Sequence, residues 1–177
     1  MELEGREKSV GISAILVTYI NIMVCKRRGI KGKTVCAGSR RIRRSGLTTY
    51  LPMIYGIGVD IVKVSRIRDA IDRWGESFVN RVFTEHEKKY CKRRMDSAGR
   101  YALRFAAKEA MSKALGTGMR RGIHCRQIEV ANDPLGKPYL RLYDDAESVC
   151  REIGIERCFL SLSDDTGYAV AMVVLEI

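Results

Sequence analysis

The stretch SAGRYALRFAAKEAMSKALGTG, residues 97–118, decides the fold of this chain. Good helix formers such as alanine and leucine fill most of it, which predicts a helix over residues 97–115. Ser97 can cap the start of this helix. Gly116 and Gly118 can end it, because glycine readily adopts the left-handed backbone conformation. This segment is therefore the longest helix that the sequence clearly indicates.

Four charged side chains fall within about three turns of that helix. Arg104 and Lys108 are four residues apart, as are Glu109 and Lys113, so each pair lies on one side of the helix. Such pairs are typical of a solvated, salt-bridged face, but they can also form a site. The alanines around them allow another backbone or a ligand to approach closely, or serve simply as helix formers: Ala106, Ala107, Ala110 and Ala114.

The segment before this helix is predicted to form a strand and two helices. Residues 55–60, YGIGVD, predict a strand that ends at Asp60. Thr84 and Glu87 have the spacing of a capping box, which predicts a helix through about residue 94. Between the predicted strand and the capping box, apolar residues recur at helical spacing and predict another helix: Ile67, Ala70, Ile71, Trp74 and Phe78. Gly75 weakens the end of this helix.

The segment after the long helix is rich in predicted strands. Residues 128–131 and 139–143 flank the turn-forming run NDPLGKP, which indicates a hairpin. Asp144 or Asp145 opens a helix that ends before Gly154, and residues 158–163 and 168–175 predict two further strands. We therefore expect one compact α+β domain over residues 53–177, with an antiparallel sheet packed against helices.

Residues 1–52 differ from this domain in charge. They carry 11 Lys and Arg against three Asp and Glu, whereas the remaining 125 residues carry 21 against 18. The apolar run over residues 9–25 falls short of the roughly 20 residues that a membrane-spanning helix needs. We interpret residues 1–52 as a basic, poorly ordered extension that is absent from the native product if translation starts at Met53. A membrane anchor is the alternative.

The net charge of +11 raises a nucleic-acid-binding module as a rival function. Most of the excess charge lies in residues 1–52, so we expect no nucleic acid partner for the domain. The six cysteines form no CxxC pair and show no zinc-ligand spacing with the two histidines, so we interpret them as reduced thiols of a cytoplasmic protein.

Two separated motifs together resemble one enzyme family. The run GIGVD at residues 56–60, followed by RFAAKEAMSKALG at residues 104–116, resembles the 4'-phosphopantetheinyl transferase signature. More narrowly, the chain is similar to the short bacterial holo-acyl-carrier-protein synthases. Further similar runs are FTEHEKKYC at residues 83–91, IEVANDPLGKPYL at residues 128–140 and LSLSDDTGYAVAMVVLE at residues 160–176. The resemblance covers nearly all of residues 53–177 and none of residues 1–52.

The resemblance implies a reaction in fatty acid biosynthesis. A carrier-protein serine attacks the phosphorus next to pantetheine in coenzyme A, and adenosine 3',5'-bisphosphate leaves. Asp60 and Glu109 are the implied Mg²⁺ ligands, since magnesium commonly takes one or two carboxylates with phosphate and water oxygens. Lys113 is expected to contact phosphate, and Arg104 or Lys108 to hold the nucleotide. Glu109, acting through a metal-bound water, is our hypothesis for the general base.

Further expectations concern the ends and the surfaces of the implied fold. Gly116 and Gly118 either let backbone N–H groups approach a phosphate or only stop the helix. Arg66 and Arg73, seven residues apart on one helix, are the candidates for docking an acidic apo-acyl-carrier protein. The family implies a homotrimer with coenzyme A at subunit interfaces. Asp164 stands where the family often has histidine, so we assign it no role.

Overall fold

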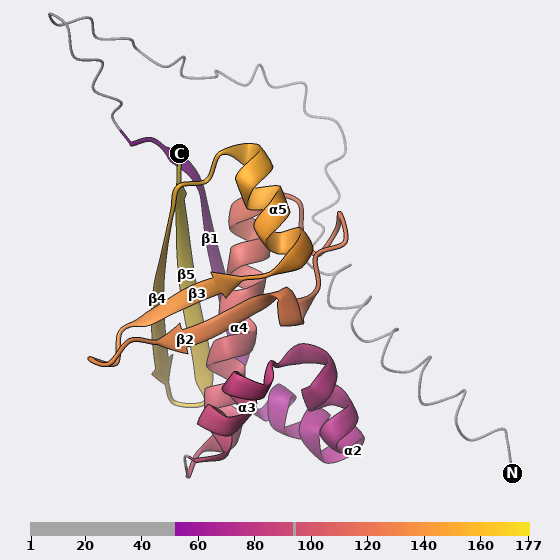
Figure 1. The fold of residues 1–177 in the computed structure, drawn as a ribbon. Coiled ribbons are helices and arrows are strands. Elements are labelled where there is room, and N and C mark those ends of the chain that lie inside the picture. The colour runs from indigo at the N-terminus through magenta and orange to yellow at the C-terminus, as the bar shows by residue number, and fades with distance from the viewer. Residues whose placement is uncertain (1–51, 94) are drawn as a thin grey trace, which may run out of the picture. The chain divides into compact units, whose positions relative to one another are not determined.

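Helix α4, Ser97–Leu115, runs through the middle of the structure, with the other elements arranged around it (Figure 1). The structure is a computed structural model that describes residues 52–93 and 95–177. The predictions for the apolar run 9–25 and the basic extension therefore lie outside the described residues. Within them, Met53–Ile177 forms one compact unit.

Two antiparallel sheets supply the strands. Three long strands lie in the order β1-β5-β4: β1 is Ile54–Lys63, β5 is Tyr168–Glu176 and β4 is Arg157–Asp165. The short strands β2, Ile128–Asn132, and β3, Pro138–Leu142, form a separate hairpin. The described residues also form three further α-helices, α2 over Val64–Val82, α3 over Glu85–Lys92 and α5 over Asp144–Ile153, and a 3-10 turn over Cys125–Gln127. The α+β prediction is confirmed.

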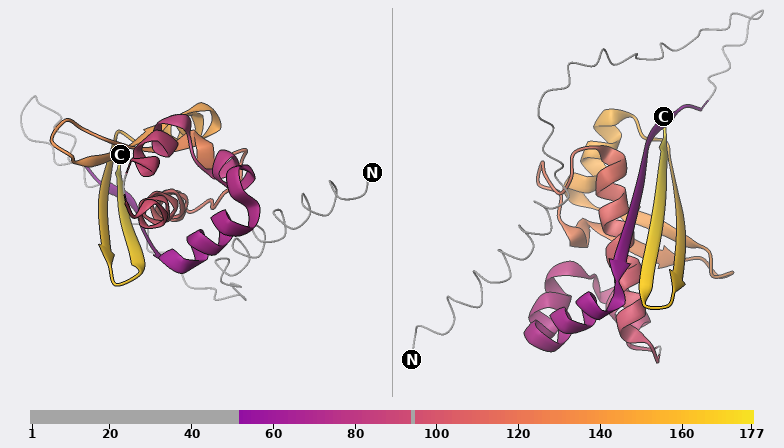
Figure 2. Two further views of the ribbon diagram at one scale, coloured as in Figure 1. Left: turned by 90° about the horizontal axis from the view of Figure 1, so that it is seen from below. Right: turned by 180° about the vertical axis from the view of Figure 1, so that it is seen from behind.

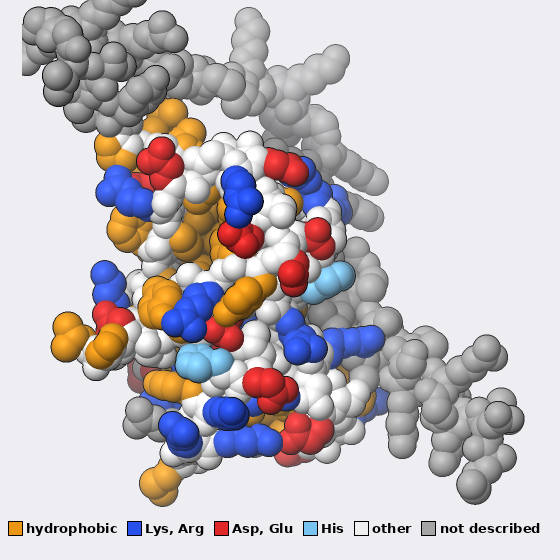
Figure 3. All heavy atoms as spheres, in the orientation of Figure 1, with side chains coloured by type: hydrophobic (Ala, Val, Ile, Leu, Met, Phe, Trp, Pro, Cys, Tyr) orange, Lys and Arg blue, Asp and Glu red, His pale blue; other side chains and the backbone are white. Residues whose placement is uncertain are grey.

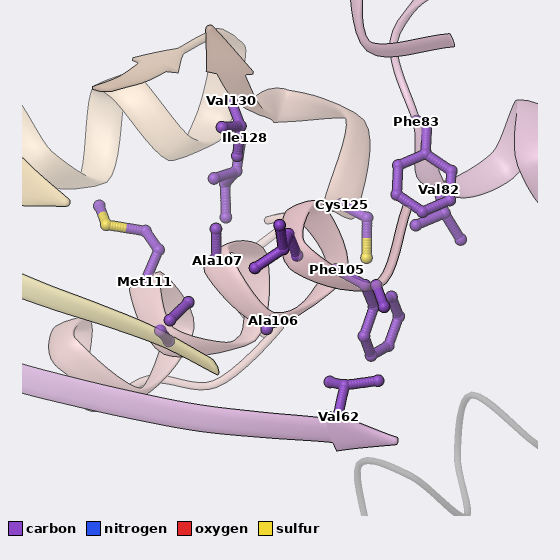
Figure 4. Packing of buried hydrophobic residues seen from close by; sticks show 14 of the residues in the cluster. Val62, Val82, Phe83, Phe105, Ala106, Ala107, Met111, Cys125, Ile128 and Val130 are labelled. Atoms are coloured by element: carbon purple, nitrogen blue, oxygen red, sulfur yellow. The ribbon is translucent and has the colours of Figure 1, made fainter. Parts of the chain in front are cut away.

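Helix α4 is buried on nearly all sides, which explains why alanine and other apolar residues fill most of it. Of its 19 residues, 16 are buried. Seen along its axis, the three-stranded sheet covers one side, and α2, α3 and the hairpin cover the others (Figure 2). In Figure 4, Ala106 and Met111 of α4 lie between Val62 of β1 and Ile128 of β2. A helix enclosed in this way belongs to the core and not to a solvated face.

Several local predictions are confirmed, and two are wrong. Thr84 and Glu87 form the predicted capping box of α3. Strand β1 does not end at Asp60, because its ladder with β5 continues as far as Lys63 and Tyr168. The N-cap of α4 is Asp96 and not Ser97, since the Asp96 carboxylate accepts the Gly99 N–H at 3.0 Å. Gly75 weakens α2 near its end, as predicted: at φ 54° it makes a kink, after which the helix continues to Val82.

No helix in the described part combines the length and the apolar character that crossing a membrane requires.

Candidate functional site

Strand β1 and helix α4 approach each other so closely that only glycine fits between them. A Cβ atom on Gly58 would lie 1.9 Å from the Ala110 carbonyl oxygen, and one on Gly56 would lie 2.1 Å from that of Ala114. Both contacts are with the helix backbone, which cannot move aside as a side chain can. The two glycines of GIGVD therefore set the distance between β1 and α4, and Asp60 follows two residues after Gly58 on the same face of the strand.

Asp60 points from β1 toward α4 and is 2% exposed. Its Oδ1 accepts a hydrogen bond from Lys113 Nζ at 2.9 Å, and the same ammonium donates to the Val59 carbonyl at 2.9 Å. The other oxygen, Oδ2, is buried and has no hydrogen-bond partner among the described residues. Burial raises the pKa of Asp60, while the Lys113 hydrogen bond opposes that rise. One carboxylate oxygen is thus held in place and the other remains available.

Glu109 lies on α4 close to Asp60. Burial raises its pKa to about 7; the negative charge of Asp60 adds to the rise and Lys113 opposes it. Among residues 52–93 and 95–177, its carboxylate forms no ion pair, and Lys113 pairs with Asp60 instead. The structure therefore brings Asp60, Glu109 and Lys113 together, as predicted. The simple ion pair between Glu109 and Lys113, the alternative explanation of their spacing, is not formed.

This arrangement has the donor set of a hard divalent cation. A buried carboxylate oxygen without a partner is unfavourable in the folded protein unless a cation or a proton joins it. Within the described residues, no cluster of three or more His, Cys, Asp or Glu side chains is placed to hold a metal. Two carboxylates suit Mg²⁺, which is commonly bound by one or two protein carboxylates together with substrate phosphates and water.

Lys108 lies in a different environment from the one that a nucleotide contact requires. Its ammonium is 0% exposed and donates to Glu87 Oε2 at 2.8 Å, to the Cys125 carbonyl at 2.9 Å and to the Ile128 carbonyl. An ammonium has three N–H donors, and all three are used. A phosphate contact of Lys108 would require one of these hydrogen bonds to break, and its contact with the nucleotide remains a prediction.

Arg104 is also enclosed, at 2% exposure. Its guanidinium lies 4.0 Å from the centre of the Tyr90 ring and donates to Asn132 Oδ1 at 3.2 Å and to the Arg100 carbonyl at 3.3 Å. Its Nε is buried and unpaired among the described residues. A contact of Arg104 with coenzyme A remains a prediction.

The glycines after α4 end the helix as predicted. Gly116 caps it with a φ of 73°, and Gly118 also has a positive φ, of 63°. Each has open space where a Cβ would stand. The approach of a phosphate to this turn, next to Lys113, remains a prediction.

Arg66 and Arg73 are exposed on α2, the helix that directly follows β1. The charge of Arg66 lowers the pKa of Asp60, so the start of α2 lies near the carboxylates. The Arg73 guanidinium lies 5.1 Å from the centre of the Trp74 ring. Asp164, to which we assigned no role, lies on β4, and its carboxylate is 4.0 Å from the Arg100 guanidinium.

Sequence reasoning missed the role of Glu87 and Glu129. Both carboxylates are buried, at 0% and 4% exposure, and both are hydrogen-bonded to Thr84. The capping box predicted the bond between Glu87 and the Thr84 backbone. It gave no sign that Glu87 also reaches Lys108, because those residues are 21 positions apart and on different helices.

Comparisons with known proteins agree on one family. A model of the 4'-phosphopantetheinyl transferase superfamily matches residues 56–173. A holo-[acyl-carrier-protein] synthase of Geobacter sp. (strain M21) is 54% identical over 124 residues, which are 70% of this chain and 99% of that protein. The structure is similar to that of the corresponding synthase from Neisseria meningitidis, with a TM-score of 0.67, 39% identity and coverage of 71% of this chain and 100% of that one. The Helicobacter pylori synthase in complex with coenzyme A gives a TM-score of 0.61 at 32% identity, covering 67% and 98%.

Proposed function

The chain belongs to the 4'-phosphopantetheinyl transferase superfamily, and we propose that it transfers 4'-phosphopantetheine from coenzyme A to a serine of an apo-acyl-carrier protein. Adenosine 3',5'-bisphosphate is the other product, and the modified carrier serves fatty acid biosynthesis. The observation that carries this proposal is the buried, unpaired Oδ2 of Asp60 beside Glu109, at the point where two glycines bring β1 against α4.

Asp60 and Glu109 are the proposed ligands of one Mg²⁺ ion. When bound, the ion would neutralise charge on the pyrophosphate oxygens, which is the main requirement of a phosphoryl transfer. The Lys113 hydrogen bond opposes the rise that burial causes in the pKa of Asp60, and so favours the ionised form that a cation needs. The coenzyme A complex of the Helicobacter pylori synthase supports coenzyme A as the donor.

Lys113 and Glu109 are the proposed catalytic residues. The Lys113 side chain is 34% exposed, so one of its N–H donors can reach a phosphate while the others hold β1. The attacking serine hydroxyl must lose a proton as its oxygen bonds to phosphorus and the bond to adenosine bisphosphate breaks. Our proposed acceptor is Glu109, acting through a water that a bound metal would hold.

The carrier protein is proposed to dock on α2 through Arg66 and Arg73. Acyl carrier proteins are acidic, so exposed guanidinium groups next to the carboxylate site would attract one and direct its serine to the reaction. On the face drawn in Figure 3, basic side chains lie interspersed with acidic ones. That mixture does not favour the continuous basic surface of a nucleic-acid-binding module.

The outer face of the three-stranded sheet supports the homotrimer that we expected. Ile57, Val59 and Ile61 alternate with the inward residues of β1 and are each at least half exposed. Met172 lies opposite Val59 on β5, and Phe159 of β4 extends the apolar face. Such a face commonly marks contact with another protein surface.

Ile57→Asp should convert the trimer to a monomer, which light scattering would detect. A monomeric parent protein would contradict the proposal.

We place the enzyme in the cytoplasm. The cysteines of the described part, Cys91, Cys125, Cys150 and Cys158, are all free thiols, as the reducing conditions of that compartment favour.

The transfer is tested with purified protein, coenzyme A, Mg²⁺ and an apo-acyl-carrier protein. Intact mass spectrometry should show the carrier gaining the mass of phosphopantetheine. An unmodified carrier, in a reaction where an active control enzyme modifies it, would overturn the proposed function.

A further inference from the structure

Lys108 and Glu87 form a fully enclosed ion pair to which the proposed reaction assigns no role. The ammonium and the carboxylate are 2.8 Å apart, and both side chains are 0% exposed. Lys108 immediately precedes Glu109 in α4. The chain thus places a buried, charged side chain directly before a proposed metal ligand.

The ammonium of Lys108 ties α4 to three other elements. Its acceptors are Glu87 of α3, Cys125 of the 3-10 turn Cys125–Gln127, and Ile128 at the start of β2. Each of the three donors has one acceptor, so the lysine is saturated. Because these acceptors come from separate segments, they fix both the rotation of α4 about its axis and its position along that axis.

Glu87 is held just as firmly. Its Oε1 accepts the Val130 N–H of β2 at 3.0 Å, and its Oε2 accepts the Thr84 N–H at 2.9 Å as well as Lys108. The Thr84 hydroxyl donates to Glu129 Oε2 at 2.6 Å, which joins a second buried carboxylate to the group. We call Lys108, Glu87, Thr84 and Glu129 the closed cluster.

A closed cluster of this kind is better suited to positioning than to stability. Replacing a buried ion pair by apolar side chains is often neutral or stabilising, so such a pair need not add to the stability of the fold. Its hydrogen bonds are directional, however, so they can fix the orientation of the elements that they join. Successive residues of a helix point about 100° apart, so the direction of Lys108 toward α3 and β2 also sets where Glu109 points. Glu109 in turn must face Asp60 on β1, on another side of α4.

We propose that Lys108 and Glu87 are positioning residues that hold Glu109 in register with Asp60 for binding a divalent cation. This inference rests on the proposed function, because it takes the two carboxylates as one cation site. It replaces the expected contact between Lys108 and the nucleotide, and the two assignments differ in what they predict for coenzyme A and for the metal.

The test uses the double variant Glu87→Gln, Lys108→Met in the full chain. Removing both charges avoids leaving one of them buried without a partner, which would unfold the protein for unrelated reasons. The matched control is Glu147→Gln, Arg151→Met, which removes the exposed pair of α5 at the same 2.8 Å separation. Circular dichroism and thermal melting establish that both variants are folded.

Two measures of metal binding, together with the KM for coenzyme A, decide the outcome. The Mg²⁺ concentration for half-maximal transfer should rise about tenfold or more, in line with the usual effect of removing a group that orients a metal ligand. The dissociation constant of Mn²⁺, measured by electron paramagnetic resonance with coenzyme A present, should rise by a similar factor. The KM for coenzyme A at saturating Mg²⁺ should stay close to the parent value, and the control should change neither metal quantity.

Unchanged Mg²⁺ and Mn²⁺ values in a folded double variant would overturn the inference, since a merely structural pair would leave them alone. A raised KM for coenzyme A with unchanged metal binding would overturn it in favour of a coenzyme contact. If the double variant does not fold, Glu87→Asp alone, which keeps the charge opposite Lys108 but shortens its side chain, should give a smaller rise in the same two quantities, and no rise would overturn the inference. The Mn²⁺ measurement needs no transfer, so it separates failure of this inference from failure of the proposed function.

Discussion

Lys108 and Lys113 lie five residues apart on α4, and each pairs with a carboxylate from another element. The two pairs differ in how completely their polar atoms are hydrogen-bonded. Lys108 and Glu87 are 0% exposed and hydrogen-bonded to capacity. Lys113 is 34% exposed, its partner Asp60 has one unpaired oxygen, and burial raises the pKa of Glu109 to about 7. The comparison teaches that charge spacing alone does not identify a site. What distinguishes the site here is the incomplete pairing of buried groups near the surface.

The largest effect that this comparison predicts is on turnover. Asp60→Ala and Glu109→Ala should each lower the transfer rate about 10²- to 10³-fold at ordinary Mg²⁺, because each removes charge stabilisation from the phosphoryl transfer. The rate is measured from the mass of the carrier. Glu147→Ala on exposed α5 serves as the control. Parent-like rates in either site variant would remove that residue as a metal ligand.

A substitution in β1 tests whether glycine sets the separation between β1 and α4. Gly58→Ala places a Cβ against the Ala110 carbonyl, so we expect stability to fall by about 3 kcal/mol or more. Gly99→Ala is a useful comparison, because its Cβ meets the side-chain carboxylate of Asp96, which can move. Chemical denaturation should show the larger loss for Gly58→Ala, and equal losses would contradict this account.

The raised pKa of Glu109 predicts that its charge destabilises the metal-free protein. The folded protein keeps the Glu109 proton up to about pH 7, while the unfolded chain releases it near 4.5. Stability contributed by this group is therefore present below pH 4.5 and lost as the pH rises through 7. Since each pKa unit is worth about 1.4 kcal/mol, the rise from 4.5 to about 7 should make Glu109→Gln more stable than the parent by on the order of 3 kcal/mol at pH 8.

That gain should shrink as the pH falls and approach zero below pH 4.5, where Glu109 is protonated in both the folded and the unfolded chain. Thermal melts with a chelator present, at pH 5 and pH 8, measure the difference. The equivalent change in the closed cluster, Glu87→Gln, should not stabilise the protein at either pH, because Glu87 is fully paired. A Glu109→Gln variant that is less stable than the parent at pH 8 would show that its carboxylate has a partner.

The smallest expected effect concerns Arg66 of α2, which lies near the carboxylates Asp60 and Glu109. Arg66→Glu should raise the KM for the carrier protein about five- to tenfold at low salt, because exposed charge pairs contribute modestly and are screened. Arg151→Glu makes the same charge change on α5 and should leave the KM unchanged. The KM for coenzyme A is followed in parallel. An unaltered carrier KM for Arg66→Glu would count against docking on α2.

Much of this fold follows from local patterns in the sequence. The capping box at Thr84, the long helix over residues 97–115 and the strand that contains Gly56 are all visible in short windows, because helical and strand periodicities are local. The end of β1 was not, since it depends on pairing with β5, more than 100 residues later.

The site was predictable only in part for the same reason. The meeting of Asp60, Glu109 and Lys113 was expected from the resemblance of two motifs to one family, and the structure brings the three together. The difference between Lys108 and Lys113 was not predictable, because both stand at helical spacing from other charges. Only the chain folded around α4 encloses Lys108 with acceptors from α3, the 3-10 turn and β2.

The central claim is that Asp60 and Glu109 hold one divalent cation together. The most direct measurement is a crystal structure of the protein with coenzyme A and Mn²⁺, in which anomalous scattering locates the metal. We predict one peak at coordination distance from both Asp60 Oδ2 and the Glu109 carboxylate, with phosphate oxygens of coenzyme A completing its shell. A metal peak that touches neither carboxylate, or coenzyme A bound at this site without any metal, would contradict the claim.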